Sequence, residues 1–188
     1  FQQVFGRNSG GLIKPYHLED AETVVIALGS VLGTIKDTVD EMRAQGVKIG
    51  VLGITSFRPF PIEAIRAVTA HAKRIVVIEK CFAVGIGGIV SRDVRSAVQS
   101  RPQQVFAVVA GLGGRAITKA SLHKLLLQAI EDKLELLTFL DLDWGIVNRV
   151  LEREKQQRRS GPVAEGILRD IGTVSREAPA AALNRSER

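Results

Sequence analysis

Two glycine-containing turns follow β-branched runs of the sequence and have the composition of a phosphate-binding turn. Gly29 and Ser30 come after one run, and Gly113, Gly114 and Arg115 come after another. Glycine lets the backbone approach a phosphate closely, and the amides of a following helix would hydrogen-bond its oxygens. The first turn lacks the third glycine of a dinucleotide fingerprint and the lysine of a P-loop. We therefore treat these five residues as candidate cofactor-binding residues, although a tight strand-to-helix turn needs glycine in any case.

No complete catalytic constellation can be read from the sequence, so we assign no catalytic residue and no metal ligand. The three histidines are far apart and have no metal-binding spacing. Cys81 is the only cysteine, which excludes an internal disulfide and a self-contained iron–sulfur or zinc site. Cys81 follows Lys80, but no histidine or second cysteine is close to it in the sequence. We do not assign it as a nucleophile.

Glu79 ends a third β-branched run, at the edge of the sheet where α/β proteins bind ligands. We interpret it as part of a structural ion pair with Lys80 or Arg92, and contact with a cationic ligand is the alternative. The glycine-rich loop 85–88 follows it. We interpret this loop as a plain connection or a subunit contact rather than a phosphate cradle.

Four units, each a short β-branched strand followed by a turn and an amphipathic helix, must position these residues. Strands that alternate with helices of ten to fifteen residues specify a mostly parallel sheet covered on both faces. The strands are predicted at Thr23–Leu28, Val47–Ile54, Arg74–Ile78 and Val105–Ala110. The helices are predicted at Gly33–Gln45, from Pro61, at Ile89–Val98, and from an N-cap at Thr118 to Lys133.

Outside these units the sequence has a different character. Residues 1–11 are expected to be a linker from a preceding domain, since the chain begins at Phe1 rather than Met. Residues 12–133 are expected to form the α/β domain, and residues 134–171 a helical extension, in which the apolar residues 134–143 are ambiguous between strand and helix. Residues 172–188 have too little apolar area to offset the entropy cost of ordering, so we expect a disordered tail.

Composition excludes some classes of function. The net charge of +6 favours an ordinary basic surface or one that faces an acidic partner. One Trp and one Tyr leave no stacking surface for single-stranded nucleic acid. No apolar run approaches the roughly 18 residues that span a bilayer, and no signal sequence is visible. A single cysteine fits a reducing cytoplasm, where we expect the protein.

Several segments, in order, resemble one family. They are Phe5-Gly6-Arg7, Gly29-Ser30…Gly33-Thr34, Arg58-Pro59-Phe60-Pro61 and Gly111–Arg115 followed by Ile117-Thr118. Over roughly residues 4–130 the chain resembles the C-terminal domain of the α subunit of pyruvate:ferredoxin oxidoreductase and related 2-oxoacid:acceptor oxidoreductases. The resemblance implies a transketolase C-terminal-like fold, a three-layer α/β/α domain. Its mostly parallel five-stranded sheet would have one antiparallel strand, which residues 12–18 would supply.

The resemblance also implies the setting of this domain. The complete enzymes cleave a 2-oxoacid oxidatively to an acyl-CoA with thiamine diphosphate, Mg²⁺ and coenzyme A. They pass electrons through [4Fe–4S] clusters to ferredoxin or another acceptor. The partners would be a thiamine-binding β subunit, a γ subunit and an iron–sulfur δ subunit. The motifs that face the substrate and hold the cofactors are absent from this chain, so no cofactor is assigned to it.

The chain departs from the family pattern at two places. Ala116 stands where the family usually has an aspartate, which would remove a local ion pair. The chain also continues beyond residue 134, which would add a contact with another subunit. Pyruvate, 2-oxoglutarate and aromatic 2-oxoacids all stay open as substrates.

Three functions are consistent with these observations. The first is an assembly domain, in which Arg58, Phe60, Gly111, Gly114 and Arg115 contact neighbouring subunits. Arginine suits this role because its planar guanidinium pairs bidentately with carboxylates. The second is a module that binds coenzyme A or a nucleotide phosphate through the glycine-rich loops. The third is a free-standing regulatory subunit that stays monomeric.

Overall fold

The computed structural model of the protein describes residues 2–7, 10–99 and 101–157. The chain divides between Leu142 and Asp143 into two units, which are treated separately below. The predicted disordered tail and residues 158–171 of the predicted extension lie outside the described residues.

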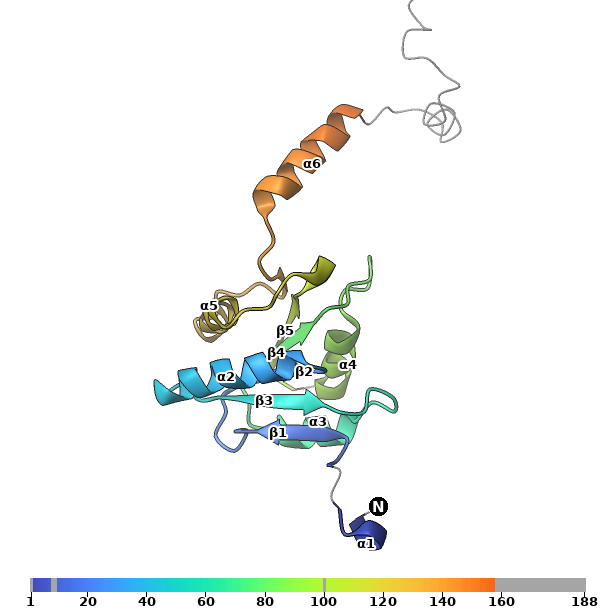
Figure 1. Ribbon diagram of the computed structural model, residues 1–188, viewed down its shortest axis with the longest axis vertical. Coiled ribbons are helices and arrows are strands. Elements are labelled where there is room, and N and C mark those ends of the chain that lie inside the picture. The colour runs from blue at the N-terminus through green and yellow to red at the C-terminus, as the bar shows by residue number, and fades with distance from the viewer. Residues whose placement is uncertain (1, 8–9, 100, 158–188) are drawn as a thin grey trace, which may run out of the picture. The chain divides into compact units, whose positions relative to one another are not determined.

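A six-stranded sheet lies at the centre of the first unit (Figure 1). The strands are β1 (Ile13–Tyr16), β2 (Thr23–Ala27), β3 (Ile49–Ile54), β4 (Arg74–Glu79), β5 (Gln104–Val109) and β6 (Leu137–Phe139). Across the sheet their order is β1-β3-β2-β4-β5-β6. β1 runs antiparallel to β3, and all the other neighbours are parallel.

The residue types explain which strands are central. Every residue of β2 and β3 is buried, as is typical of β-branched strands covered on both faces. β1 lies at the edge, where Pro15 can be accommodated although it has no N–H to donate. The antiparallel strand expected within residues 12–18 is therefore confirmed.

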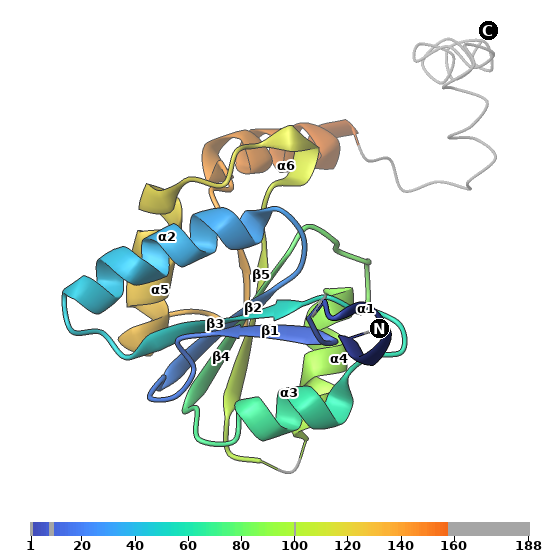
Figure 2. The same ribbon diagram turned by 60° about the horizontal axis from the view of Figure 1, so that its bottom comes forward.

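Helices cover both faces of the sheet. In chain order the helices of this unit are α1 (Gln2–Phe5), α2 (Val31–Ala44), α3 (Ile62–Val68), α4 (Ile89–Val98), the short 3₁₀ helix η1 (Leu112–Gly114) and α5 (Lys119–Ile130). α2 and α5 pack on one face, and α3 and α4 pack on the other (Figure 2). The predicted three-layer α/β/α class is confirmed.

Each face of the sheet has its own hydrophobic core. On one face, Ile35 of α2 packs in the same cluster as Ile78 of β4. On the other face, Val94 of α4 packs in the same cluster as Val77 of β4. Successive residues of β4 therefore point to opposite layers, as in any strand. This alternation also decides where the residues at its carboxyl end point.

The segment after α5 differs from its prediction. We expected five strands and a helical extension from residue 134, but Leu137–Phe139 forms β6 and pairs with β5. The expectation of helix is wrong for this segment, because three residues are too few for hydrophobic periodicity to separate strand from helix. In the predicted linker, residues 2–5 form one helical turn, α1.

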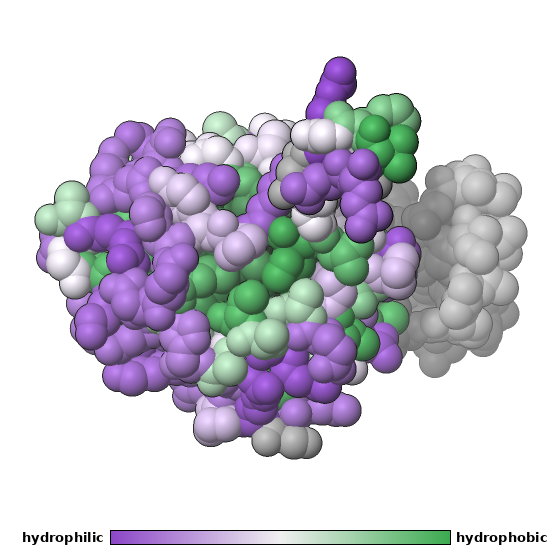
Figure 3. Space-filling model, turned by 90° about the horizontal axis from the view of Figure 1, so that it is seen from below, coloured by the Kyte–Doolittle hydropathy of each residue, from purple (hydrophilic) through white to green (hydrophobic). Residues whose placement is uncertain are grey.

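The face on which β1 lies in Figure 1 is seen directly in Figure 3. A band of apolar residues crosses this face between hydrophilic areas. No helix of the described residues is long and apolar enough to cross a membrane.

In the second unit the described residues form one helix, α6 (Trp144–Gln157). Asp143 precedes it, and its Oδ1 accepts a hydrogen bond from the Ile146 N–H at 3.1 Å, which satisfies one amide of the first turn. Trp144, Val150 and Leu151 are exposed apolar residues of this helix.

Candidate functional site

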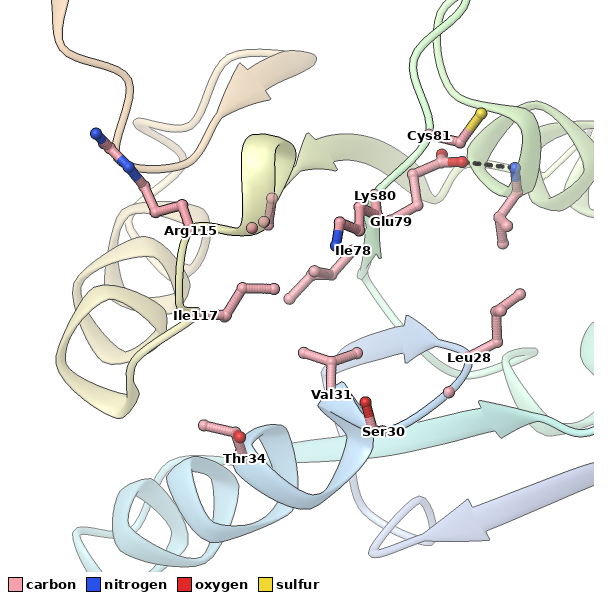
Figure 4. Close-up of a pocket in the computed structure, with 15 residues that line it drawn as sticks. Leu28, Ser30, Val31, Thr34, Ile78, Glu79, Lys80, Cys81, Arg115 and Ile117 are labelled. Atoms are coloured by element: carbon pink, nitrogen blue, oxygen red, sulfur yellow. Dashed lines mark hydrogen bonds between the residues drawn. The ribbon is translucent and has the colours of Figure 1, made fainter.

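A change of direction in the topology opens a crevice between β2 and β4. The chain leaves β2 for α2 on one face of the sheet and leaves β4 for α4 on the other. Because these neighbouring strands send their connections to opposite faces, a crevice forms at their carboxyl ends, where α/β proteins bind ligands. A cavity of ≈ 540 Å³ lies at this position (Figure 4).

Three strand ends line the cavity. Its walls come from residues 28–31 after β2, 78–81 at the end of β4 and the segment after β5. Figure 4 shows Val31, Ile78 and Ile117 pointing toward one another, so these three residues form an aliphatic part of the wall. Polar and charged side chains line the rest of the cavity together with backbone. The arrangement resembles small-molecule sites in general, which combine apolar walls with a few polar groups.

Gly29 and Ser30, predicted from the first turn, lie in this cavity. Gly29 has a φ of +87°, which few residues other than glycine adopt without strain. Ser30 is the N-cap residue of α2, but its side chain makes no capping hydrogen bond, and the first turn of α2 has no acidic residue. In that first turn the Leu32 N–H donates to the Gly29 carbonyl oxygen at 3.3 Å, and the Gly33 N–H donates to the Ser30 carbonyl oxygen at 3.2 Å. The Val31 N–H has no acceptor among the described residues, so it is available to an anion.

Glu79 has a different role from the predicted one. Its carboxylate is buried and accepts hydrogen bonds from the Val90 and Ser91 N–H groups, both at 2.9 Å. It caps the N-terminus of α4 and forms no ion pair with Lys80 or Arg92 in the structure. A carboxylate at the positive end of a helix is stabilised there.

Lys80 is the cavity residue that sequence reasoning considered only as a neighbour of Glu79 and Cys81. Its side chain turns toward the side of Ile78 and Ile117, away from α4 (Figure 4). It makes no hydrogen bond or ion pair with another described residue. Side chains alternate between the two faces of a sheet along a strand, so Lys80 is expected on the same face as Ile78. This alternation could have predicted the position of the Lys80 side chain from the sequence.

The second glycine-rich turn lines the cavity with backbone atoms and does not direct a charged side chain into it. Gly111 and Gly114 line the cavity with φ values of +75° and +79°, whereas Gly113 lies outside the lining. Arg115 is at the rim, but its guanidinium donates to the Asp141 carbonyl oxygen and points away from the cavity interior (Figure 4).

Arg58 and Phe60 are not part of this site. They lie between β3 and α3, where Arg58 pairs with Asp93 of α4 at 2.8 Å. The Arg58 guanidinium also lies 3.9 Å from the centre of the Phe57 ring. Phe60 packs against the core beneath α3 and α4. The structure therefore brings together the two glycine turns and Lys80, and leaves the proline-containing loop on the other layer.

The remaining chemistry-bearing residues are dispersed. Cys81 lines the cavity as an exposed free thiol, and no histidine lines it. His71 lies near the start of β4 and is hydrogen-bonded to the Leu18 carbonyl oxygen at 2.7 Å. Among residues 2–7, 10–99 and 101–157, no three His, Cys, Asp or Glu side chains gather in a group that could hold a metal ion.

Comparison with known proteins places the fold and this site in a family. Residues 21–122 match the family described as pyruvate:ferredoxin oxidoreductase core domain II. The chain belongs to this family. The matched range runs from the start of β2 into α5 and includes every residue that lines the cavity. The predicted resemblance is confirmed.

Two curated relatives are longer than this chain, and the chain matches part of the length of each. Pyruvate synthase subunit PorA of Methanosarcina barkeri is 43% identical over 129 residues, which is 67% of this chain and 32% of that protein. Ketoisovalerate oxidoreductase subunit VorA of Pyrococcus horikoshii is 36% identical over 121 residues, 63% of this chain and 30% of that protein. The chain spans about a third of the length of these relatives.

A solved structure supports the fold of this core domain II member. The 2-oxoglutarate:ferredoxin oxidoreductase from Magnetococcus marinus, determined with 2-oxoglutarate, coenzyme A and succinyl-CoA, superposes with a TM-score of 0.51. The match has 19% sequence identity and covers 71% of this chain and 21% of that chain. At this identity the likeness shows the fold alone.

Proposed function

We propose that this chain is part of the α subunit of a CoA-acylating 2-oxoacid oxidoreductase. The reaction would be oxidative decarboxylation of a 2-oxoacid to an acyl-CoA, with ferredoxin or another electron acceptor. Membership of the core domain II family and the relatives named as oxidoreductase subunits support this reading. The relatives differ in the 2-oxoacid that their names give, so the proposal stops at the substrate class.

We further propose that this segment serves subunit contacts and leaves the chemistry to other parts of the enzyme. The supporting observation is a group of exposed apolar side chains in the loops that follow β2, β4 and β5. This carboxyl-edge surface consists of Leu28, Phe82, Val84, Ile86 and Leu112. Exposed apolar groups of this kind are typical of protein–protein contact sites.

The most exposed part of the carboxyl-edge surface is a small ordered loop. Val84 is 91% exposed and Ile86 is 56% exposed. Between Ala83 and Gly87 the backbone makes two hydrogen bonds, at 2.9 and 2.8 Å, which fix the loop. Phe82 packs edge-to-face on Phe139 of β6, with ring centres 5.1 Å apart. A fixed loop that holds aliphatic side chains in water is suited to a neighbouring protein surface.

The partners and cofactors follow from the same proposal. The carboxyl edge, with Gly111, Gly114 and Arg115, would face the thiamine-binding β, γ or iron–sulfur δ subunits or another domain of the α subunit. Thiamine diphosphate, Mg²⁺, [4Fe–4S] clusters and coenzyme A would be bound there. Arg58 and Phe60 make their contacts within this chain, so we propose that they stabilise the conformation of their loop. A cytoplasmic setting would keep Cys81 reduced.

An assay of the purified 188-residue chain tests the proposal that the chemistry belongs to other parts of the enzyme. It would be incubated with pyruvate or 2-oxoglutarate, coenzyme A, thiamine diphosphate, Mg²⁺ and a dye acceptor. We expect no acyl-CoA from a sample that unfolds cooperatively. Turnover by the chain alone would contradict the proposal.

A further inference from the structure

We propose that the cavity at the carboxyl edge is a binding site for a phosphate ester that carries an apolar or aromatic group. This inference does not depend on the subunit-contact function, since every group it uses belongs to this chain. It starts from the cavity itself. Its volume of ≈ 540 Å³ lies within the range of about 300–1,000 Å³ that is usual for small-molecule sites.

The alternation at the end of β4 separates Glu79 and Lys80, two of the three charged residues that line the cavity. Glu79 turns toward α4, where its carboxylate accepts the Val90 and Ser91 amides. Lys80, the next residue, turns toward the layer of α2 and α5 (Figure 4). Glu79 therefore already occupies the anion position of α4, and the ammonium group of Lys80 lies on the side of α2.

The anionic head group would bind between Lys80 and the start of α2. Lys80 has no ion-pair partner among the described residues, and its side chain lines the cavity. Opposite it are the Ser30 hydroxyl, which makes no capping bond, and the Val31 N–H, whereas the Leu32 and Gly33 amides donate to backbone carbonyls. An ammonium, a hydroxyl and a backbone amide supply donors to several oxygens at once, which suits a tetrahedral phosphate.

The apolar part of the ligand would lie deeper in the cavity. Val31, Ile78 and Ile117 face one another there, and Gly111 lies beside Ile117, where an added Cβ atom would be 3.3 Å from Cδ1 of that residue. These walls offer no hydrogen-bond partner to a free inorganic ion, but they would bury an aliphatic or aromatic group. The site therefore selects an ester over inorganic phosphate.

The structure changes which residues carry this binding. The sequence suggested Gly113 and Arg115, but Gly113 lies outside the cavity, and the Arg115 guanidinium is bonded to the Asp141 carbonyl. Lys80 takes the place of Arg115 as the charged group, and Ser30 remains.

The test is calorimetric titration of the 188-residue chain with phenyl phosphate, inorganic phosphate and phenol. We expect phenyl phosphate to bind most tightly, because neither of the other probes combines the head group with the apolar body. Lys80→Gln should weaken phenyl phosphate binding about tenfold or more, because a charge-assisted bond is lost. Lys124→Gln removes the same charge from the exposed side of α5 and should leave the affinity unchanged.

Ser30→Asp gives a second, independent readout. It places a carboxylate at the start of α2, which the helix dipole favours, so the unliganded chain should unfold at an unchanged or higher temperature. The same carboxylate would repel the phosphate, and binding of phenyl phosphate should be lost. A separate titration with adenosine 5′-monophosphate shows whether the natural ester is a nucleotide or a smaller phosphate.

Three results would overturn the inference. The first is the absence of phenyl phosphate binding at millimolar concentration. The second is an equal effect of the two lysine substitutions. The third is a Ser30→Asp chain that binds phenyl phosphate as the unaltered chain does. Because no other subunit is present, these results stand apart from the outcome of any assembly experiment.

Discussion

The carboxylate of Glu79 occupies the space that a Cβ atom at Gly88 would fill. A side chain at Gly88 would overlap this carboxylate and would lie 2.6 Å from Oγ of Ser91. The glycine loop after β4 therefore ends in glycine for a steric reason. The close approach lets Glu79 reach the Val90 and Ser91 amides and fix the start of α4.

Gly88→Ala should lower the free energy of unfolding by about 2 kcal/mol or more, because displacing the carboxylate breaks charge-assisted bonds to two buried amides. Urea unfolding of the purified chain measures this change. Gly33→Ala is the matched control: apart from its chain neighbours and the backbone of its own helix, no atom lies within 4 Å of its added Cβ, and Gly33 is within α2. The control should stabilise the chain by about 0.5–1 kcal/mol. A Gly88→Ala chain as stable as the original would show that Glu79 does not hold α4.

The two helices that border the cavity on one layer should respond differently to loss of their N-cap hydroxyls. Thr118 Oγ1 accepts the Ser121 N–H at 3.1 Å, whereas the Ser30 side chain makes no capping bond. Thr118→Ala should therefore cost about 1 kcal/mol of unfolding free energy. Ser30→Ala should change it by less than about 0.5 kcal/mol. Equal losses in thermal unfolding would mean that Ser30 already caps α2.

The loss of folding stability at acid pH should depend in part on the ion pair between Arg74 and Asp132. Arg74 donates to both carboxylate oxygens of Asp132, at 2.7 and 3.0 Å, and this hydrogen bonding holds the pKa of Asp132 below its usual value. The unfolded chain then binds a proton more readily than the folded one. The stability from this pair is complete above about pH 4 and is lost as the pH falls through the lower folded pKa.

Asp132→Asn should therefore make the unfolding temperature less dependent on pH below about pH 4. Asparagine tolerates the positive φ of +55° at this position. Asp141→Asn, at a φ of +56° and without an ion pair to a described residue, is the control and should keep the original dependence. Glu22 also has a lowered pKa, through its bond from Lys73, so part of the acid sensitivity should persist in both variants. Superimposable pH profiles for Asp132→Asn and the original chain would contradict this assignment.

Much of the fold could be predicted because its central strands are uniform β-branched runs separated by helices. β2 and β3 appear within their predicted ranges, and the turns that end them do as well. β6 could not be predicted, because its three residues acquire their strand character only by pairing with β5. Local sequence carries no signal for such a pairing.

The candidate site was predicted in part. Both glycine turns were identified and do meet at one cavity, since carboxyl ends of parallel strands share an edge. The roles of the charged residues were not predicted. Glu79 was expected to pair with a cation, but backbone amides that lie 11 and 12 residues later satisfy it. Arg115 was expected to bind a ligand or partner, and a carbonyl 26 residues away takes its guanidinium. Both depend on contacts that only the folded chain makes.

The central claim is that this segment provides contact surface for a 2-oxoacid oxidoreductase and not its chemistry. The most direct measurement is affinity purification of the full-length enzyme that carries Val84→Asp and Ile86→Asp together, with the mass of the complex and the turnover per mole of intact complex both recorded. We predict that recovery of the intact complex falls about tenfold or more, that turnover per intact complex stays the same, and that the altered subunit unfolds at its original temperature. Full recovery of the complex, or a complex of unchanged mass with reduced turnover, would contradict the account.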